Sequence, residues 1–213
     1  MAHMLVHRGL GNKRLVENTI QAFSYCFKNK YGIETDLQVT KDNKIICFHD
    51  FTLKKFKINK NISDLSLKEI QSVGKKFKFE IPEINKLIKI SKNRHYIMLE
   101  LKSLFSKKSI HKLLKLTKKH RNFCITSFKE ENIKNIYKIR KNLKLGLLFA
   151  STSKPEKIIK KSKNPYVKLL VMEKKFLDNR KLLNIKKPIY FYTARSKLLR
   201  KKYKDRNLIF EYI

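Results

Sequence analysis

The chain contains 213 residues, of which 42% are hydrophobic, and its 52 Lys and Arg against 17 Asp and Glu give a net charge of +35. This length and apolar content suit one folded domain, residues 1–213, and exclude a disordered chain. No stretch approaches the ~20 apolar residues that cross a bilayer, and the first residues lack the apolar core of a signal peptide.

The net charge has two interpretations. One is an anionic partner, either a nucleic acid or a membrane surface. The other is composition, because Lys, Ile and Asn are abundant together, as an AT-rich genome would encode. The basic residues are spread along the chain, are mainly Lys and form no Arg-rich tail. This spread favours the compositional interpretation, so we expect weak attraction to anionic membrane surfaces and no dedicated nucleic-acid partner.

Short apolar runs recur along the chain. Many are continuous rather than alternating, which is typical of strands buried on both faces. They predict strands at Met4–His7, Ile33–Val39, Lys44–His49, Tyr96–Lys102, Phe123–Ser127, Lys144–Ala150, Val167–Met172, Pro188–Thr193 and Asn207–Tyr212.

Between these runs the apolar residues follow helical spacing. In a capping box, a serine accepts a hydrogen bond from a backbone amide three residues on, where a glutamate reaches back. This spacing occurs at Ser66, Ser127 and Ser153. Helices are therefore predicted to begin at these serines and to cover Thr19–Phe27, Ile110–Leu116 and Ile133–Ile139.

Alternating strands and helices favour an α/β fold with a parallel sheet. The turn residues Asp42 and Asn43 predict that Lys44–His49 returns as a hairpin after Ile33–Val39, which leaves eight strands for a parallel sheet. The sequence thus predicts one compact (β/α)8 barrel, with a short insertion after the second strand and its hairpin.

Three carboxylates lie in these apolar strands. Glu34 and Asp36 are two residues apart, so both point to the same face of a strand, and Glu100 stands near the end of a later strand. Side-by-side carboxylates repel unless a cation lies between them. Three of them without a cysteine suit one hard divalent cation, Mg²⁺ or Ca²⁺.

Other polar residues end the same strands. His7 and His49 each close an apolar run beside the acidic residues, a position that suits general acid–base catalysis. Arg8 and Lys102 would add positive charge at the same place and could hold a phosphate. In a barrel, the carboxyl ends of the strands meet at one mouth, where active sites are built.

These residues form an ordered set that resembles the glycerophosphodiester phosphodiesterase family. The matching motifs are His7-Arg8-Gly9, Glu17-Asn18-Thr19, Glu34-x-Asp36, Thr40-Lys41-Asp42, His49-Asp50 and Glu100-Leu101-Lys102. The resemblance is strong over residues 4 to 102 and fades after about residue 150.

The resemblance implies a (β/α)8 barrel that hydrolyses small-molecule glycerophosphodiesters to an alcohol and glycerol 3-phosphate. By the same resemblance, a divalent cation is held by Glu34, Asp36 and Glu100, while His7 and His49 form the acid–base pair. It further implies that Arg8 and Lys102 bind the phosphate and that Glu17 and Asn18 support the mouth.

The sequence departs from the family at several points, including Phe51 where a proline is usual and the absence of any tryptophan. Two alternatives therefore stay open. One is hydrolysis of a lysophospholipid at the same site, with the aromatic residues Phe51, Phe56, Phe191 and Tyr192 near the mouth. The other is a basic barrel that binds nucleic acid and has lost catalysis.

Overall fold

A computed structural model describes residues 3–213. Within them, eight parallel strands close into a barrel, with β1 paired to both β9 and β2. The barrel strands are β1 (Met4–Val6), β2 (Gly32–Val39), β4 (Ile97–Leu101), β5 (Phe123–Ser127), β6 (Leu145–Phe149), β7 (Leu169–Glu173), β8 (Ile189–Ala194) and β9 (Asn207–Phe210). The predicted (β/α)8 barrel is confirmed.

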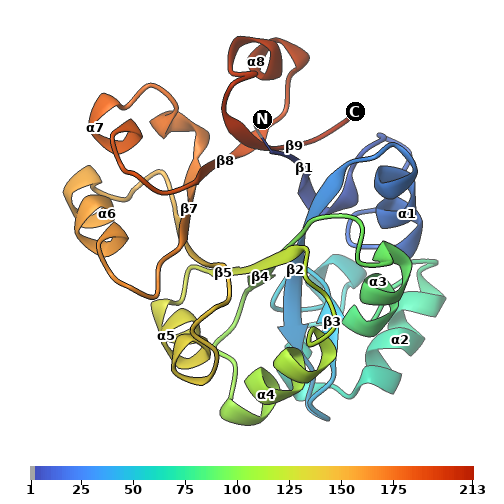
Figure 1. Cartoon of the computed structure of the whole chain (residues 1–213). Coiled ribbons are helices and arrows are strands. Elements are labelled where there is room, and N and C mark those ends of the chain that lie inside the picture. Colours follow the sequence, from blue (N-terminus) through green and yellow to red (C-terminus); the bar gives the residue numbers. More distant parts are fainter. Residues whose placement is uncertain (1–2) are drawn as a thin grey trace.

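Helices surround the strands, as the view along the barrel in Figure 1 shows. The helices that follow barrel strands are α1 (Ile20–Lys28), α3 (Ile84–Ser91), α4 (Lys107–Leu116), α5 (Glu130–Ile139), α6 (Pro155–Ser162), α7 (Arg180–Leu183) and α8 (Lys197–Lys202). The helices after β7 and β8 are short, which explains how a barrel fits a chain of this length.

The predicted hairpin is present, because β3 (Ile45–Cys47) pairs antiparallel with β2. The insertion that follows contains two short 3₁₀ turns, Lys54–Phe56 and Ile62–Asp64, and helix α2 (Leu67–Lys76). It has a small apolar core of its own. That core consists of Ile46, Phe48, Leu53, Phe56, Ile62, Leu65, Ile70 and Ile81.

The capping prediction is correct at one serine of three. Ser66 caps α2 in a complete capping box with Glu69. Ser127 is instead buried at the end of β5 and donates a hydrogen bond to the carbonyl of Leu101, so Lys129 precedes α5. Ser153 lies before α6, which begins at Pro155 because proline suits the first helical position.

Successive side chains of each barrel strand alternate between two apolar layers. One layer packs between strands and helices and includes Phe23, Leu99 and Ile110. The other fills the barrel interior and includes Met98, Val171 and Ile209. This interior layer is apolar, and the polar side chains that point into the barrel gather beyond it, at the carboxyl ends of the strands.

The three cysteines, Cys26, Cys47 and Cys124, are buried, and burial raises the pKa of each thiol to about 12. Among residues 3–213, no helix combines the length and apolar character that a bilayer crossing requires.

Candidate active site

A cavity of about 260 Å³ opens at the carboxyl ends of the strands. It is lined by six residues that the sequence predicted for the site: His7, Arg8, Glu34, His49, Glu100 and Lys102. Further lining comes from Met98, Thr126, Phe128, Leu148, Val171, Tyr192, Thr193, Arg195 and Ile209. Strands from both halves of the sequence therefore build this cavity.

The three predicted carboxylates meet inside the barrel. β2 pairs with β4 in a register that sets Asp36 beside Glu100, and Glu34 lies two residues earlier on the same face. One carboxylate oxygen from each of the three lies within 4.8 Å of the others, and all three residues are buried. The strand alternation read from the sequence is thus sufficient to bring the acidic residues together.

This crowding changes their titration. Burial, together with the charges of Asp36 and Glu100, raises the pKa of Glu34 well above its usual range. Burial and the Asp36 charge raise the pKa of Glu100 to about 7. Burial would also raise the pKa of Asp36, but the nearby charges of Arg8 and Lys102 outweigh it and lower that pKa.

The carboxylates fit a hard divalent cation. Glu100 Oε1 is buried and makes no hydrogen bond, and its one close partner is the ammonium group of Lys102, so this oxygen can also serve as a ligand. The ligand set is oxygen only and compact, as Mg²⁺ and Ca²⁺ require. A cation among the three oxygens would also remove the mutual repulsion that raises the pKa values of Glu34 and Glu100.

Two basic side chains balance part of the acidic charge. Lys102 Nζ lies 3.0 Å from Glu100 Oε1 and 3.5 Å from Asp36 Oδ1. Arg8 donates from Nη1 to Glu17 at 2.8 Å, while its Nε lies 3.1 Å from Asp36 Oδ2 without a hydrogen-bond alignment. Both cations line the cavity, where an incoming anion would compete with the carboxylates for them.

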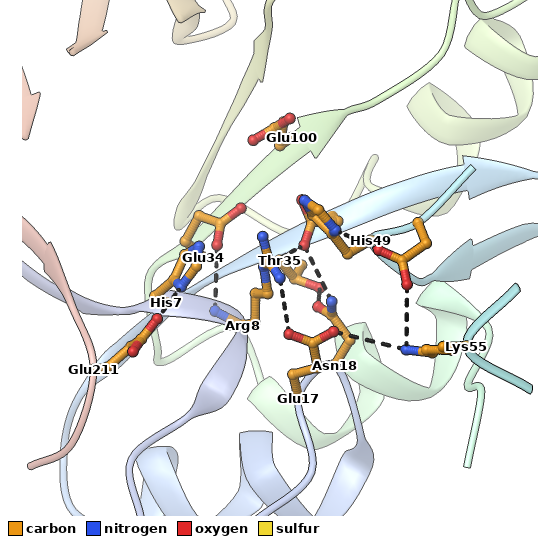
Figure 2. A network of polar contacts seen from close by, with 12 residues as sticks. His7, Arg8, Glu17, Asn18, Glu34, Thr35, His49, Lys55, Glu100 and Glu211 are labelled. Carbon is orange, nitrogen blue, oxygen red and sulfur yellow. Dashed lines mark hydrogen bonds and ion pairs between the residues drawn. The ribbon is translucent and has the colours of Figure 1, made fainter. Parts of the chain in front are cut away.

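The predicted supporting residues hold this arrangement. Asn18 is buried, donates to Asp36 Oδ2 at 3.1 Å and accepts from the Thr35 hydroxyl at 2.7 Å. Its backbone has a φ of 57°, a left-handed conformation that asparagine tolerates better than most residues. Glu17 orients the Arg8 guanidinium (Figure 2). Glu17 and Asn18 thus act on the site through Arg8 and Asp36.

His7 has a carboxylate partner that the sequence analysis missed. Its Nδ1 lies 3.0 Å from Oε1 of Glu211, which follows β9 (Figure 2). Burial lowers the pKa of His7, and the hydrogen bond with Glu211 opposes that effect. Glu211 is the next-to-last residue of the predicted strand Asn207–Tyr212, so the rule that polar residues at strand ends meet at the mouth could have identified it.

His49 is held in a similar way. Its Nδ1 lies 2.8 Å from Oδ1 of Asp50, whose other oxygen is 3.8 Å from Lys55 Nζ. Lys55 also lies 3.7 Å from Glu17, and its ammonium group packs over the rings of Phe48 and Phe79. The insertion therefore contributes a cation that links the His49 and Arg8 sides of the site.

The aromatic residues expected near the mouth divide into two groups. Tyr192 lines the cavity, and Phe51 is exposed. The expectation is wrong for Phe56, which is buried in the apolar core of the insertion. It is also wrong for Phe191, which is buried in the layer between strands and helices. Phe128 lines the cavity instead, edge-on to Tyr192 with ring centroids 6.4 Å apart.

Comparisons with known proteins identify the relatives of this chain. The profile of the glycerophosphoryl diester phosphodiesterase family matches residues 7–202. A glycerophosphodiester phosphodiesterase from Caldanaerobacter subterraneus is 31% identical over 110 residues, which are 47% of this chain and 45% of that protein. The chain thus matches less than half the length of this curated relative.

Solved structures share the fold over nearly the whole chain. A glycerophosphodiester phosphodiesterase from Thermotoga maritima has a TM-score of 0.82 at 19% identity, covering 99% of this chain and 94% of that one. A phosphodiesterase from Oleispira antarctica, solved with its product sn-glycerol-3-phosphate, has a TM-score of 0.81 at 17% identity, covering 99% and 92%. At such identities the similarity establishes the barrel fold.

Proposed function

The chain belongs to the glycerophosphoryl diester phosphodiesterase family, and we propose that it hydrolyses glycerophosphodiesters to an alcohol and glycerol 3-phosphate. The observation that carries this proposal is that two carboxylate-bound histidines line one cavity together with Glu34 and Glu100 of the buried three-carboxylate cluster. Phosphodiester hydrolysis needs a base, an acid and positive charge at the phosphate, and the cavity offers a group for each.

His7 is the general base. With Nδ1 bound to Glu211, its Nε2 is the ring nitrogen available to accept a proton. Burial lowers the pKa of His7, so the imidazole is neutral near pH 7. His7 removes the proton from the glycerol hydroxyl beside the phosphate. The oxygen of that hydroxyl then bonds to phosphorus and gives a cyclic phosphate.

His49 is the general acid. Its Nδ1 is held by Asp50, which leaves Nε2 to carry the transferable proton. As the bond from phosphorus to the leaving alcohol breaks, His49 protonates the alcohol oxygen. The two histidines then exchange roles. His49 takes a proton from the water molecule that attacks the cyclic phosphate, and His7 returns a proton to the glycerol oxygen that leaves phosphorus.

Positive charge for the phosphate comes from the chain and from a cation. Glu34, Asp36 and Glu100 would hold Mg²⁺ or Ca²⁺, which supplies Lewis-acid stabilisation of charge on the phosphate oxygens. Arg8 and Lys102 line the same cavity and bind the phosphate oxygens when substrate enters. Glu17 and Asn18 keep Arg8 and Asp36 in position.

Glycerol 3-phosphate as the product is consistent with the related structure from Oleispira antarctica, which contains that molecule. The cavity volume of about 260 Å³ suits a glycerol phosphate better than a large head group. The head group that leaves as the alcohol would extend toward the open mouth, past the exposed Phe128 ring.

The direct test is an assay of the purified protein on glycerophosphocholine with Mg²⁺, with Ca²⁺ and with a chelator. We expect release of choline and glycerol 3-phosphate that depends on the cation and is lost in the His7→Ala, His49→Ala double variant. If neither Mg²⁺ nor Ca²⁺ supports hydrolysis, the proposal is refuted. Faster cleavage of acylated glycerophosphocholine in the same assay would favour a lysophospholipid as substrate.

A further inference from the structure

Exposed apolar side chains gather at one end of the molecule. Among the described residues, the large hydrophobic side chains that are exposed are Val16, Phe51, Phe77, Leu104, Phe128, Ile139 and Leu198. Five of them, Val16, Phe51, Leu104, Phe128 and Leu198, occur after strand ends at the mouth of the barrel. We call these five residues the apolar rim.

The order of the strands explains how the rim surrounds the mouth. Val16 follows β1, Phe51 follows the β2–β3 hairpin, Leu104 follows β4 and Phe128 follows β5. Strands β1, β2, β4 and β5 are successive neighbours in the barrel, so their loops form a continuous arc. Leu198 lies on the other side of the mouth, in α8, where it is 78% exposed.

Each rim residue has an exposed basic residue close to it in the chain. These neighbours are Arg14, Lys54, Lys107, Lys129 and Lys197. Apolar side chains among cations form the type of surface that binds at a lipid interface, where the side chains enter the acyl region and the cations contact anionic headgroups.

Charge alone does not select this end of the barrel. The segments that lead from helices into the next strands, at the opposite end, all carry Lys or Arg, and Asp205 is their single acidic residue in the described chain. That end would also attract anions. However, among residues 3–213, Ile139 at the end of α5 is the one large hydrophobic side chain exposed at that end. The opposite end of the barrel therefore offers no group of apolar side chains for insertion.

We propose that the apolar rim docks the mouth of the barrel onto an anionic phospholipid bilayer. The cavity that holds His7 and His49 then faces the lipid headgroups. This docking is a property of the surface and does not depend on whether the proposed reaction occurs.

The test compares sedimentation of the full chain with vesicles of phosphatidylcholine alone and of phosphatidylcholine with phosphatidylserine. The rim variant is Leu104→Asp with Leu198→Asp, because neither residue lines the cavity. The matched control is Ile139→Asp, since Ile139 is 44% exposed, comparable with 54% for Leu104, but lies at the opposite end. Hydrolysis of dissolved glycerophosphocholine and circular dichroism report on an intact fold.

We expect binding to the vesicles with phosphatidylserine to weaken about tenfold for each leucine replaced and to be unchanged in Ile139→Asp, with hydrolysis of the dissolved substrate retained. Equal loss in the control and the rim variant would overturn the proposal. So would unchanged binding of the rim variant with loss in Lys144→Glu, Lys168→Glu, which would assign binding to the opposite end. Absence of vesicle binding by the unaltered chain would overturn it as well.

Discussion

The imidazole Nδ1 of His7 lies 3.0 Å from Oε1 of Glu211, although 204 residues separate the two along the chain. The contact exists because β1 pairs with β9 to close the barrel, with Val6 opposite Phe210. The histidine that we propose as the general base is therefore held by a residue that directly follows the last strand, and the second half of the chain contributes to the site.

Replacing Glu211 with glutamine tests this orientation. The hydrogen bond with Glu211 raises the pKa of His7 against the effect of burial, so its loss should lower that pKa further. We expect kcat to fall by about tenfold to a hundredfold and the acidic limb of the kcat/KM profile to move to lower pH. The control is Glu173→Gln at the end of β7, where the carboxylate accepts from the amide of Lys175. A pH profile unchanged by Glu211→Gln would show that Glu211 does not position His7.

The proton donor can be identified by changing the leaving group. His49→Ala should reduce turnover of glycerophosphocholine by about a hundredfold to ten-thousandfold but should spare a p-nitrophenyl ester, because nitrophenolate leaves without a proton. His7→Ala should reduce both reactions, since both need the base. His111→Ala is the control, because this exposed histidine bonds the carbonyl of Lys107 away from the cavity. Equal loss on both substrates in His49→Ala would contradict the assignment.

Cation binding should strengthen with pH. Burial and the charge of Asp36 raise the pKa of Glu100 to about 7, so below that pH a proton competes with the metal ion. We expect calorimetry to give a lower Kd for Mg²⁺ or Ca²⁺ at about pH 8 than at about pH 5, with proton release on binding. Glu34→Gln should bind the ion much more weakly at both pH values. A Kd independent of pH and of this substitution would place the ion elsewhere.

The hydroxyl of Thr126 is buried beside Glu100, lines the cavity and makes no hydrogen bond. Such a group costs stability unless a ligand satisfies it. We expect Thr126→Val to leave the fold at least as stable while KM rises about tenfold, because the substrate loses a hydrogen bond. Thr117→Val is the contrasting control: its hydroxyl donates to the carbonyl of Leu113, so stability should fall by about 1 kcal/mol with KM unchanged. An unchanged KM in Thr126→Val would show that substrate does not use this hydroxyl.

The capping box of the insertion is testable by stability alone. Ser66→Ala removes the side-chain acceptor for the Glu69 amide and should destabilise α2 by about 1 kcal/mol, measured as a lower midpoint of urea unfolding. Ser72→Ala is the control, because Ser72 is exposed in the same helix and alanine favours helices. A midpoint unchanged by Ser66→Ala would mean that the insertion unfolds separately from the barrel.

Much of the site was predictable because strand geometry is local. A period of two places Glu34 and Asp36 on one face, and the position of a residue at a strand end places it at the mouth. These two rules correctly located His7, Arg8, His49, Glu100 and Lys102 in one cavity. The order of short apolar runs and amphipathic segments likewise determined the barrel class.

The three-dimensional structure decided which side chains meet across long separations. No local pattern pairs Glu211 with His7, or directs Lys55 toward Glu17 and Asp50, because these contacts depend on barrel closure and on the packing of the insertion. The same packing buries Phe56 and leaves Phe51 exposed, although both are aromatic residues of one loop. The sequence alone thus determined the fold class and most of the polar residues that line the cavity. Their partners and the apolar rim depend on the closed tertiary fold, since burial is a property of neighbours that are distant in the chain.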